Sequence, residues 1–203
     1  MKHSGTADLV SSKNMKNHLR QHIIQGLGKV PDNLDTVLDA FVEKKAKRNE
    51  LLLQEGDICR HVYFIVKGCV QVFVIAENGT ESTREFYFEN QWVTDIFGFQ
   101  NQLPSKEYIR CVEPCHLLAI SFDQFQAMSA AFPPFLQMYR QILEVSYNNT
   151  VYRVNTFTSM NALERINWLH EHKPKMLTRL SSRLVASYLG ISPETFTRLK
   201  GKL

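Results

Sequence analysis

The chain has 203 residues, of which 44% are hydrophobic, enough for one large domain or two small ones with an apolar core. This composition excludes a disordered or collagen-like chain, and four cysteines are too few for a disulfide scaffold. The sequence has no apolar run of about 18 residues for a transmembrane helix, and no apolar N-terminal stretch for a secretory signal. We therefore expect a soluble, cytoplasmic protein.

The net charge of +4, from 24 lysines and arginines against 20 acids, is unevenly distributed. Residues 173–203 carry seven basic residues and one acid, a net +6, which leaves −2 for the other 172 residues. A basic tail on a mildly acidic body is typical of a nucleic-acid-binding module. A solvated basic face is the alternative that charge alone leaves open.

The N-terminal region divides into a polar leader and a helical segment. Residues 1–14 are small, polar and unpatterned, so we expect a disordered leader, and Met15 offers an alternative start. Residues 16–43 are expected to be helical. Their apolar residues at helical spacing are Leu34, Leu38 and Phe41.

Residues 48–121 have the pattern of a β-domain. Runs rich in β-branched and aromatic residues predict strands at 62–66, 70–75, 84–88, 108–112 and 116–120. Asn78-Gly79, between the second and third of these runs, is a strong hairpin signal. Strands at this spacing indicate a sandwich or barrel.

After the last strand we expect a short helix at 122–131 and a long one at 134–158. The long segment carries two apolar stripes, one of which could cover the β-domain while the other pairs with a second copy as a dimerisation helix. The residues expected at the dimer seam are Met138, Ile142, Val145, Asn149 and Tyr152. A single surface helix with a wide apolar face is the alternative.

Residues 160–171 predict a further helix, and the segment beyond it has the pattern of a helix-turn-helix. Ser182 can cap a helix that ends at Gly190, where the chain can turn through a left-handed conformation. A second helix then starts with Ser192 as cap, Pro193 at the first position and Glu194 in the first turn. Two helices joined by a short glycine turn form the helix-turn-helix arrangement.

The second helix would enter the major groove of DNA with its N-terminus first. Glu194 and Arg198 share one face, where arginine can bind O6 and N7 of guanine and glutamate can accept from the amino group of cytosine. Phosphate contacts are expected from Arg183, Ser192, Thr195, Thr197, Lys200 and Lys202. An ordinary helical hairpin with a Glu–Arg pair is the alternative.

The ordered set of elements and motifs resembles the Crp/Fnr family of bacterial transcription regulators. The resemblance rests on residues 53–57, 62–68, 119–121 and 186–198. It implies an α+β fold with three parts: a jelly-roll sensor domain of the cyclic-nucleotide-binding type over residues 15–133, a dimerisation helix over 134–158, and a winged helix-turn-helix domain over 159–203. The family's recognition helix has glutamate and arginine at the positions of Glu194 and Arg198, and little sequence follows it here for a wing.

Family members that bind cyclic AMP carry Gly-Glu-Leu and then Arg-Ser in a phosphate cassette, whose arginine neutralises the cyclic phosphate. The matching residues here are Thr94, Asp95, Ile96, Ser105 and Lys106. The glycine and the arginine are both replaced, and a lysine lacks the bidentate fork of an arginine. We therefore expect no useful affinity for cyclic AMP, although this segment could line a pocket for another effector or form a vestigial one.

The four cysteines are Cys59, Cys69, Cys111 and Cys115. They lack the N-terminal cluster of the family's oxygen-sensing branch and any C-x-x-C pair, so we interpret them as buried structural thiols. No paired histidines for a metal site, catalytic triad, P-loop or dinucleotide motif appears. We expect no metal, no cofactor and no enzymatic activity.

The sequence as a whole predicts a homodimeric transcription regulator that binds a pseudo-palindromic operator and carries a β-roll sensor. Its partners would be double-stranded DNA, a second copy of itself and an unidentified small-molecule effector, with no membrane. The alternative is a β-roll module that regulates a partner protein without binding DNA.

Overall fold

The computed structural model describes residues 4–201, with side chains from residue 14 onward. The chain divides into two compact units, of which the first comprises Met1–Gln71 and Tyr87–Ile142 and the second Val72–Phe86 and Leu143–Leu203. It therefore crosses between the units three times, twice in neighbouring strands and once within the long helix.

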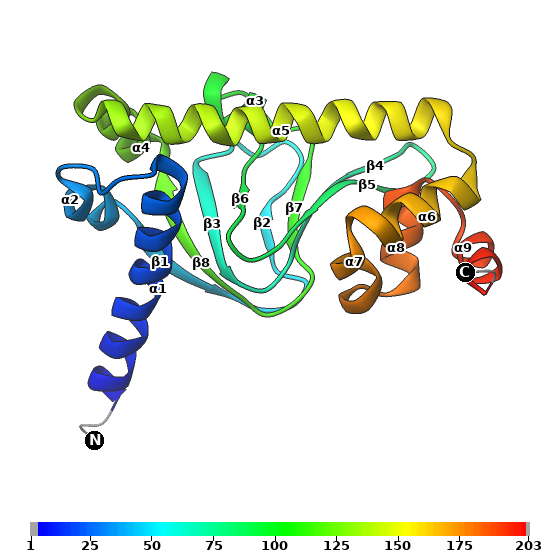
Figure 1. Cartoon of the computed structure of the whole chain (residues 1–203), viewed down its shortest axis with the longest axis horizontal. Coiled ribbons are helices and arrows are strands. Elements are labelled where there is room, and N and C mark those ends of the chain that lie inside the picture. Colours follow the sequence, from blue (N-terminus) through cyan, green and yellow to red (C-terminus); the bar gives the residue numbers. More distant parts are fainter. Residues whose placement is uncertain (1–3, 202–203) are drawn as a thin grey trace. The chain divides into compact units, whose positions relative to one another are not determined.

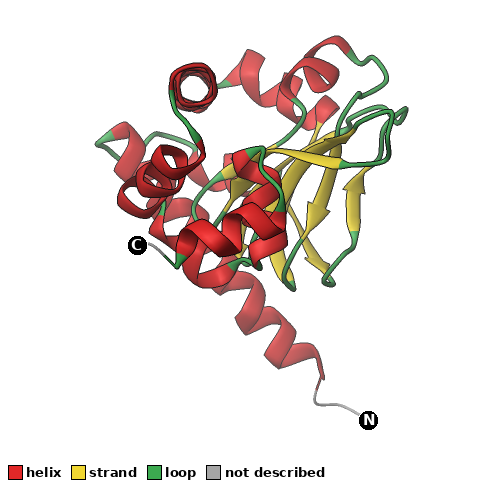
Figure 2. Cartoon of the chain, turned by 90° about the vertical axis from the view of Figure 1, so that its right-hand side faces the viewer, coloured by secondary structure: helices red, strands yellow, loops and turns green. Residues whose placement is uncertain are grey.

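The strands gather into one β-rich region (Figure 2) and form two four-stranded sheets among the described residues. The first sheet has the order β1-β8-β3-β6, with bounds Val42–Ala46, Cys115–Ser121, His61–Lys67 and Trp92–Val93. The second has the order β2-β7-β4-β5, with bounds Leu51–Leu53, Tyr108–Cys111, Val70–Ile75 and Glu81–Tyr87. The start of β4 belongs to the first unit, and most of β4 and β5 belongs to the second.

The core of the first unit centres on the antiparallel pair β3 and β8, in which Tyr63 lies opposite Ala119. Residues 62–65 and 117–120 are all buried. Both strands are therefore continuous apolar runs rather than alternating ones, as expected of strands that are covered on both faces.

Four helices of the first unit are α1 (Ser4–Leu27), α2 (Leu34–Asp39), α3 (Ile96–Asn101) and α4 (Phe122–Ala131), and they can be followed in Figure 1. The described part of α1 buries Met15, Leu19 and Ile23 at helical spacing, and α1 packs against β3. In α1, His22 accepts a hydrogen bond from the indole N–H of Trp92 at 3.2 Å, which joins α1 to β6.

The second unit contains the C-terminal part of α5 (Pro133–Ser159) together with α6 (Ala162–His172), α7 (Pro174–Arg179), α8 (Ser182–Leu189) and α9 (Pro193–Lys200). Arg165 of α6 joins these helices, since its guanidinium donates to the carbonyl oxygens of Phe157, Met160 and Leu189 at 2.9–3.1 Å. Because these carbonyls belong to the end of α5, the following turn and the end of α8, one side chain connects three parts of the unit.

The α+β fold, the long helix and most strands agree with the sequence prediction, but the N-terminal prediction needs correction. The helical structure of α1 begins at Ser4, inside the segment interpreted as a disordered leader. The helix predicted over 16–43 ends at Leu27, and the strand β1 already begins at Val42. β1 is a strand because it pairs with β8 along its whole length, a contact that local sequence does not encode.

Candidate nucleic-acid interface

α8 and α9 form the helix-turn-helix that the sequence predicts. Gly190 between them has a φ of +65°, and a Cβ at this position would lie 2.6 Å from the Phe157 ring. Both the backbone conformation and the available space therefore require glycine. Ala186 of α8 and Phe196 of α9 are buried, and α8 packs directly against α9.

Serine caps start both helices, although one cap differs from the prediction. The hydroxyl of Ser181, rather than that of Ser182, accepts from the Leu184 N–H at 3.4 Å, because Ser181 has the extended backbone of a cap. In α9 the hydroxyl of Ser192 accepts from the Thr195 N–H at 3.1 Å, as predicted.

The predicted DNA-contacting residues are mostly open to solvent. Those that are exposed are Arg183, Ser192, Glu194, Thr197, Arg198 and Lys200. Thr195 is partly buried, and Lys202 lies outside the described residues. The backbone N–H of Glu194, followed by the Ser192 hydroxyl, holds the pKa of Glu194 below its usual value, so this side chain is an anionic acceptor at neutral pH.

The hairpin β4–β5 packs against the helix-turn-helix inside the second unit, which sequence reasoning did not anticipate. The Ser187 hydroxyl of α8 donates to the Glu81 carbonyl oxygen at 2.8 Å and accepts from the Thr83 N–H at 3.1 Å. Lys173, in the turn before α7, pairs with Glu85 of β5 at 2.7 Å. These partners lie 88 to 106 residues apart in sequence, so no local sequence pattern predicts their contacts.

Lys173 was counted in the basic tail, and the structure gives it a different role. Burial would lower the pKa of Lys173, but Glu85 and Tyr188 overcome this effect and raise the pKa above its usual value. Its ammonium group is committed to these two partners. The basic charge on the outside of the tail is therefore smaller than the sequence total.

The residues predicted for the dimer seam have unequal exposure. Val145 and Tyr152 are 59% and 63% exposed, and Ile142 and Asn149 are partly buried. Met138 is only 6% exposed, because it packs inside the first unit of its own chain. It therefore does not contribute to the open face of α5.

The predicted effector residues are mostly engaged within the fold. Asp95 caps α3 by accepting from the Gly98 N–H at 3.0 Å, and Thr94 donates to the His61 carbonyl oxygen at 3.0 Å. The Ser105 hydroxyl accepts from the Glu107 N–H at 3.0 Å. Thr94, Asp95 and Ser105 are buried, Ile96 is partly buried and Lys106 is exposed.

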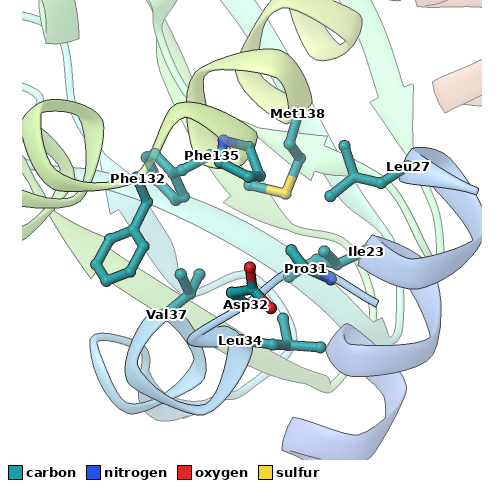
Figure 3. A pocket seen from close by; sticks show the side chains of 10 residues that line it. Ile23, Leu27, Pro31, Asp32, Leu34, Val37, Phe132, Phe135 and Met138 are labelled. Carbon is teal, nitrogen blue, oxygen red and sulfur yellow. The ribbon is translucent and has the colours of Figure 1, made fainter. Parts of the chain in front are cut away.

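Two hollows in the first unit are lined by other residues. One has a volume of about 340 Å³ and is lined by residues 52, 53, 57–61 and 63. The second is mainly apolar, and in it Ile23 and Leu27 of α1 lie across from Phe135 and Met138 of α5 (Figure 3). None of the five predicted effector residues lines either hollow.

All four cysteines are buried thiols outside any disulfide, which confirms the prediction of buried thiols. The Cys115 thiol donates to the Cys69 carbonyl oxygen at 3.5 Å. No three side chains of histidine, cysteine, aspartate or glutamate come together as metal ligands within the described part of the chain. Within residues 4–201, no helix is both long and apolar enough to cross a membrane.

Comparison with known proteins points to regulatory proteins that have a cyclic nucleotide-binding domain. Residues 43–132 match the cyclic nucleotide-binding domain family. The anaerobic regulatory protein of Pasteurella multocida is 24% identical over 85% of this chain and 66% of its own length. The fumarate and nitrate reduction regulatory protein of Yersinia pestis is 23% identical over 84% of this chain and 71% of its own length.

Among solved structures, FixK2 from Bradyrhizobium japonicum has a TM-score of 0.70 at 15% identity, covering 80% of this chain and 84% of that one. Together these findings support a common fold, a β-sandwich domain followed by a C-terminal helix-turn-helix. Over most of its length the chain is similar to transcription regulators of the Crp/Fnr type, and these relatives are regulators rather than enzymes. The chain spans about two thirds of the length of the Pasteurella relative.

Proposed function

We propose that the chain is a homodimeric DNA-binding transcription regulator of the cytoplasm, and that α9 reads a pseudo-palindromic operator. The observation that carries this proposal is the two-sided character of α9. Its Phe196 side is buried, whereas Glu194 and Arg198 are exposed and lie four residues apart on one face. Arg198 then binds guanine and Glu194 accepts from cytosine in the major groove.

The remaining exposed polar groups around α9 supply contacts to the phosphate backbone in this proposal. Arg183 and Lys200 provide charge, and the N-terminus of α9 presents its hydroxyls and amides to a phosphate. Such contacts release counterions from DNA, so the affinity depends steeply on salt. They position the protein without carrying sequence information.

Fluorescence anisotropy with a random-sequence duplex, measured across a salt series, tests DNA binding directly. We expect affinity that falls steeply between about 50 and 200 mM salt. The double variant Arg183→Ala/Lys200→Ala should reduce the slope of log affinity against log salt by about 2, one for each phosphate contact. Absence of salt-dependent binding at low ionic strength would favour the alternative, a module that regulates a partner protein.

The dimer of this proposal is formed by the open face of α5. Val145 and Tyr152 lie seven residues apart and therefore on one side of the helix. Ile142, one turn before Val145, and Asn149, one turn before Tyr152, lie on the same side. Two such faces would bury apolar area from each other and place two recognition helices roughly 34 Å apart. A polar Asn149 at this seam would fix the register of the pair.

Analytical ultracentrifugation of the double variant Val145→Glu/Tyr152→Glu tests this face. We expect the double variant to be monomeric under conditions in which the unmodified chain is dimeric. Thr150→Glu adds a carboxylate on the other side of the same helix and should remain dimeric. A dimer that survives the double substitution, or one that Thr150→Glu abolishes equally, would contradict the assignment.

We also propose that the β-sandwich senses an effector other than cyclic AMP. The support is chemical: no arginine occupies the phosphate position, and Asp95 and Ser105 already form hydrogen bonds within the fold. Titration calorimetry of the full chain with cyclic AMP should detect no binding. Micromolar or tighter binding would overturn this part of the proposal.

A further inference from the structure

A largely buried polar cluster, whose members Arg153, Lys173 and Ser187 are partly exposed, joins the β4–β5 hairpin to α5 and α8 within the second unit. We call it the hairpin cluster. Its members are Thr83, Glu85, Arg153, Lys173, Ser187 and Tyr188.

One half of the cluster, formed by Thr83, Ser187 and Arg153, binds the backbone of β5 from two sides. The Ser187 hydroxyl lies 2.8 Å from the Thr83 hydroxyl and also bonds to the backbone of Glu81 and Thr83. Arg153 of α5 donates to the Thr83 carbonyl oxygen at 2.5 Å. Thr83 is completely buried, so these bonds are protected from competition with water.

The other half of the cluster, built around Lys173 and Glu85, fixes the position of α8. The Lys173 ammonium lies 2.7 Å from the Glu85 carboxylate and 3.1 Å from the Tyr188 hydroxyl. The Arg153 guanidinium stacks over the Tyr188 ring at 4.4 Å. A buried carboxylate such as that of Glu85 is costly unless its partner stays in place, so the cluster favours a single arrangement of hairpin and helices.

We propose that the hairpin cluster is a positioning device that holds the helix-turn-helix on the hairpin and thereby sets the direction in which α9 is presented to DNA. The hairpin is continuous with the β-sandwich, since β4 begins and β5 ends in the first unit. A shift of these strands is therefore transmitted to α8 and α9 as a rigid-body movement. Glu85, Lys173 and Ser187 are positioning residues, and the inference rests on the proposed function of α9.

The test compares binding to two half-sites with binding to one. The half-site is first selected from a random duplex library with the unmodified chain. Duplexes then carry two half-sites either one helical turn apart or with about 5 additional base pairs, half a turn, between them. A dimer with fixed recognition helices gains avidity only at the matching spacing.

We expect Glu85→Gln and Ser187→Ala each to reduce the preference for the matching spacing by roughly tenfold, with the affinity for a single half-site unchanged. Exchanging the charges in Glu85→Lys/Lys173→Glu should restore part of the preference that Glu85→Gln loses. Glu77→Gln is the matched control, because it removes the same charge from the exposed turn of the same hairpin and should change nothing.

Two results would overturn the inference: an unchanged spacing preference in both cluster variants, or a parallel loss of half-site affinity, which would mean a merely structural role.

A second readout does not depend on DNA. Spin labels at positions 77 and 183, both exposed, should give a narrow distance distribution that Glu85→Gln broadens. A distribution that is equally broad in both proteins would overturn the inference, whereas failure of the unmodified chain to bind any duplex would overturn only the proposed function.

Discussion

The first unit buries aromatic and aliphatic side chains around β3 and β8, whereas the second unit places a buried carboxylate beside a partly buried ammonium and guanidinium, between a hairpin and helices. Apolar burial is non-directional, so it stabilises a fold while tolerating some repacking. Buried charges need particular partners at particular distances, so they specify one arrangement. Under the proposed function, a sensor core and a positioned DNA-reading unit would place these two different demands on their interiors.

Each unit contains one of the two tryptophans, Trp92 in the first and Trp168 in the second. The single-tryptophan variants Trp168→Phe and Trp92→Phe therefore report the unfolding of the two units separately. These two backgrounds serve the stability predictions that follow.

The largest expected effect is on the second unit. Glu85→Ala leaves the partly buried Lys173 without its carboxylate, and we expect it to destabilise this unit by about 3 kcal/mol. Urea unfolding followed by Trp168 fluorescence measures the loss, and the Trp92 signal should change much less. Glu77→Ala, on the exposed turn of the hairpin, should be close to neutral. Equal shifts of both tryptophan signals would remove the distinction between the units.

Two glycines with positive φ allow the stability cost of crowding to be distinguished from the cost of backbone strain. At Gly68, with φ +108°, a Cβ would lie 2.6 Å from the Cys115 sulfur and 2.8 Å from the Pro114 carbonyl oxygen. Gly68→Ala should therefore cost the first unit roughly 2–4 kcal/mol through overpacking and backbone strain combined.

Gly79 is the matched control, since it has φ +78° and no atom within 4 Å of an added Cβ. Gly79→Ala should cost only about 1 kcal/mol of backbone strain, seen in the Trp168 signal. Similar losses at the two positions in urea unfolding would show that crowding at Gly68 is relieved by small movements.

In the second unit, substitutions on the exposed face of α9 should distinguish contacts to bases from nonspecific contacts to phosphates. Arg198→Ala should cost roughly 1–3 kcal/mol of operator affinity and relax the base preference at one position per half-site. Lys200→Ala should weaken binding to all sequences about equally. Selection from a random duplex library, followed by anisotropy, measures both. An unchanged preference for Arg198→Ala, or a sequence-selective loss for Lys200→Ala, would contradict the groove assignment.

The smallest expected effect is the pH dependence of the first unit. Burial lowers the pKa of His22 below its usual 6.5, so the folded state favours the neutral ring that accepts from Trp92. Its contribution to stability is complete above pH 6.5 and is lost as the pH falls through the lowered pKa.

Chemical unfolding at pH 7.5 and 5.5, followed by Trp92 fluorescence, should therefore show lower stability at the acidic pH. The loss should be smaller in His22→Phe, which retains an aromatic ring but does not titrate. His61, whose pKa is also lowered by burial, is present in both proteins and cancels in the comparison. Identical pH dependence in the two proteins would assign the effect to other groups.

The sequence by itself determined the elements that depend on local signals. The turn at Gly190 and the cap at Ser192 encode the helix-turn-helix, because backbone conformation and side-chain capping act over a few residues. Strands β3, β4, β5, β7 and β8 follow equally from runs of β-branched and aromatic residues, whereas β1, β2 and β6 were not predicted.

Only the tertiary structure decided which surfaces remain open and which charges are paired. Met138 belongs to a stripe suited to a dimer seam, but it is buried because α1 packs beside it. Lys173 looks like one more cation in a basic tail, yet it is partly buried and paired with Glu85, 88 residues earlier in the chain. Burial and pairing depend on contacts between distant segments, and no local pattern records them.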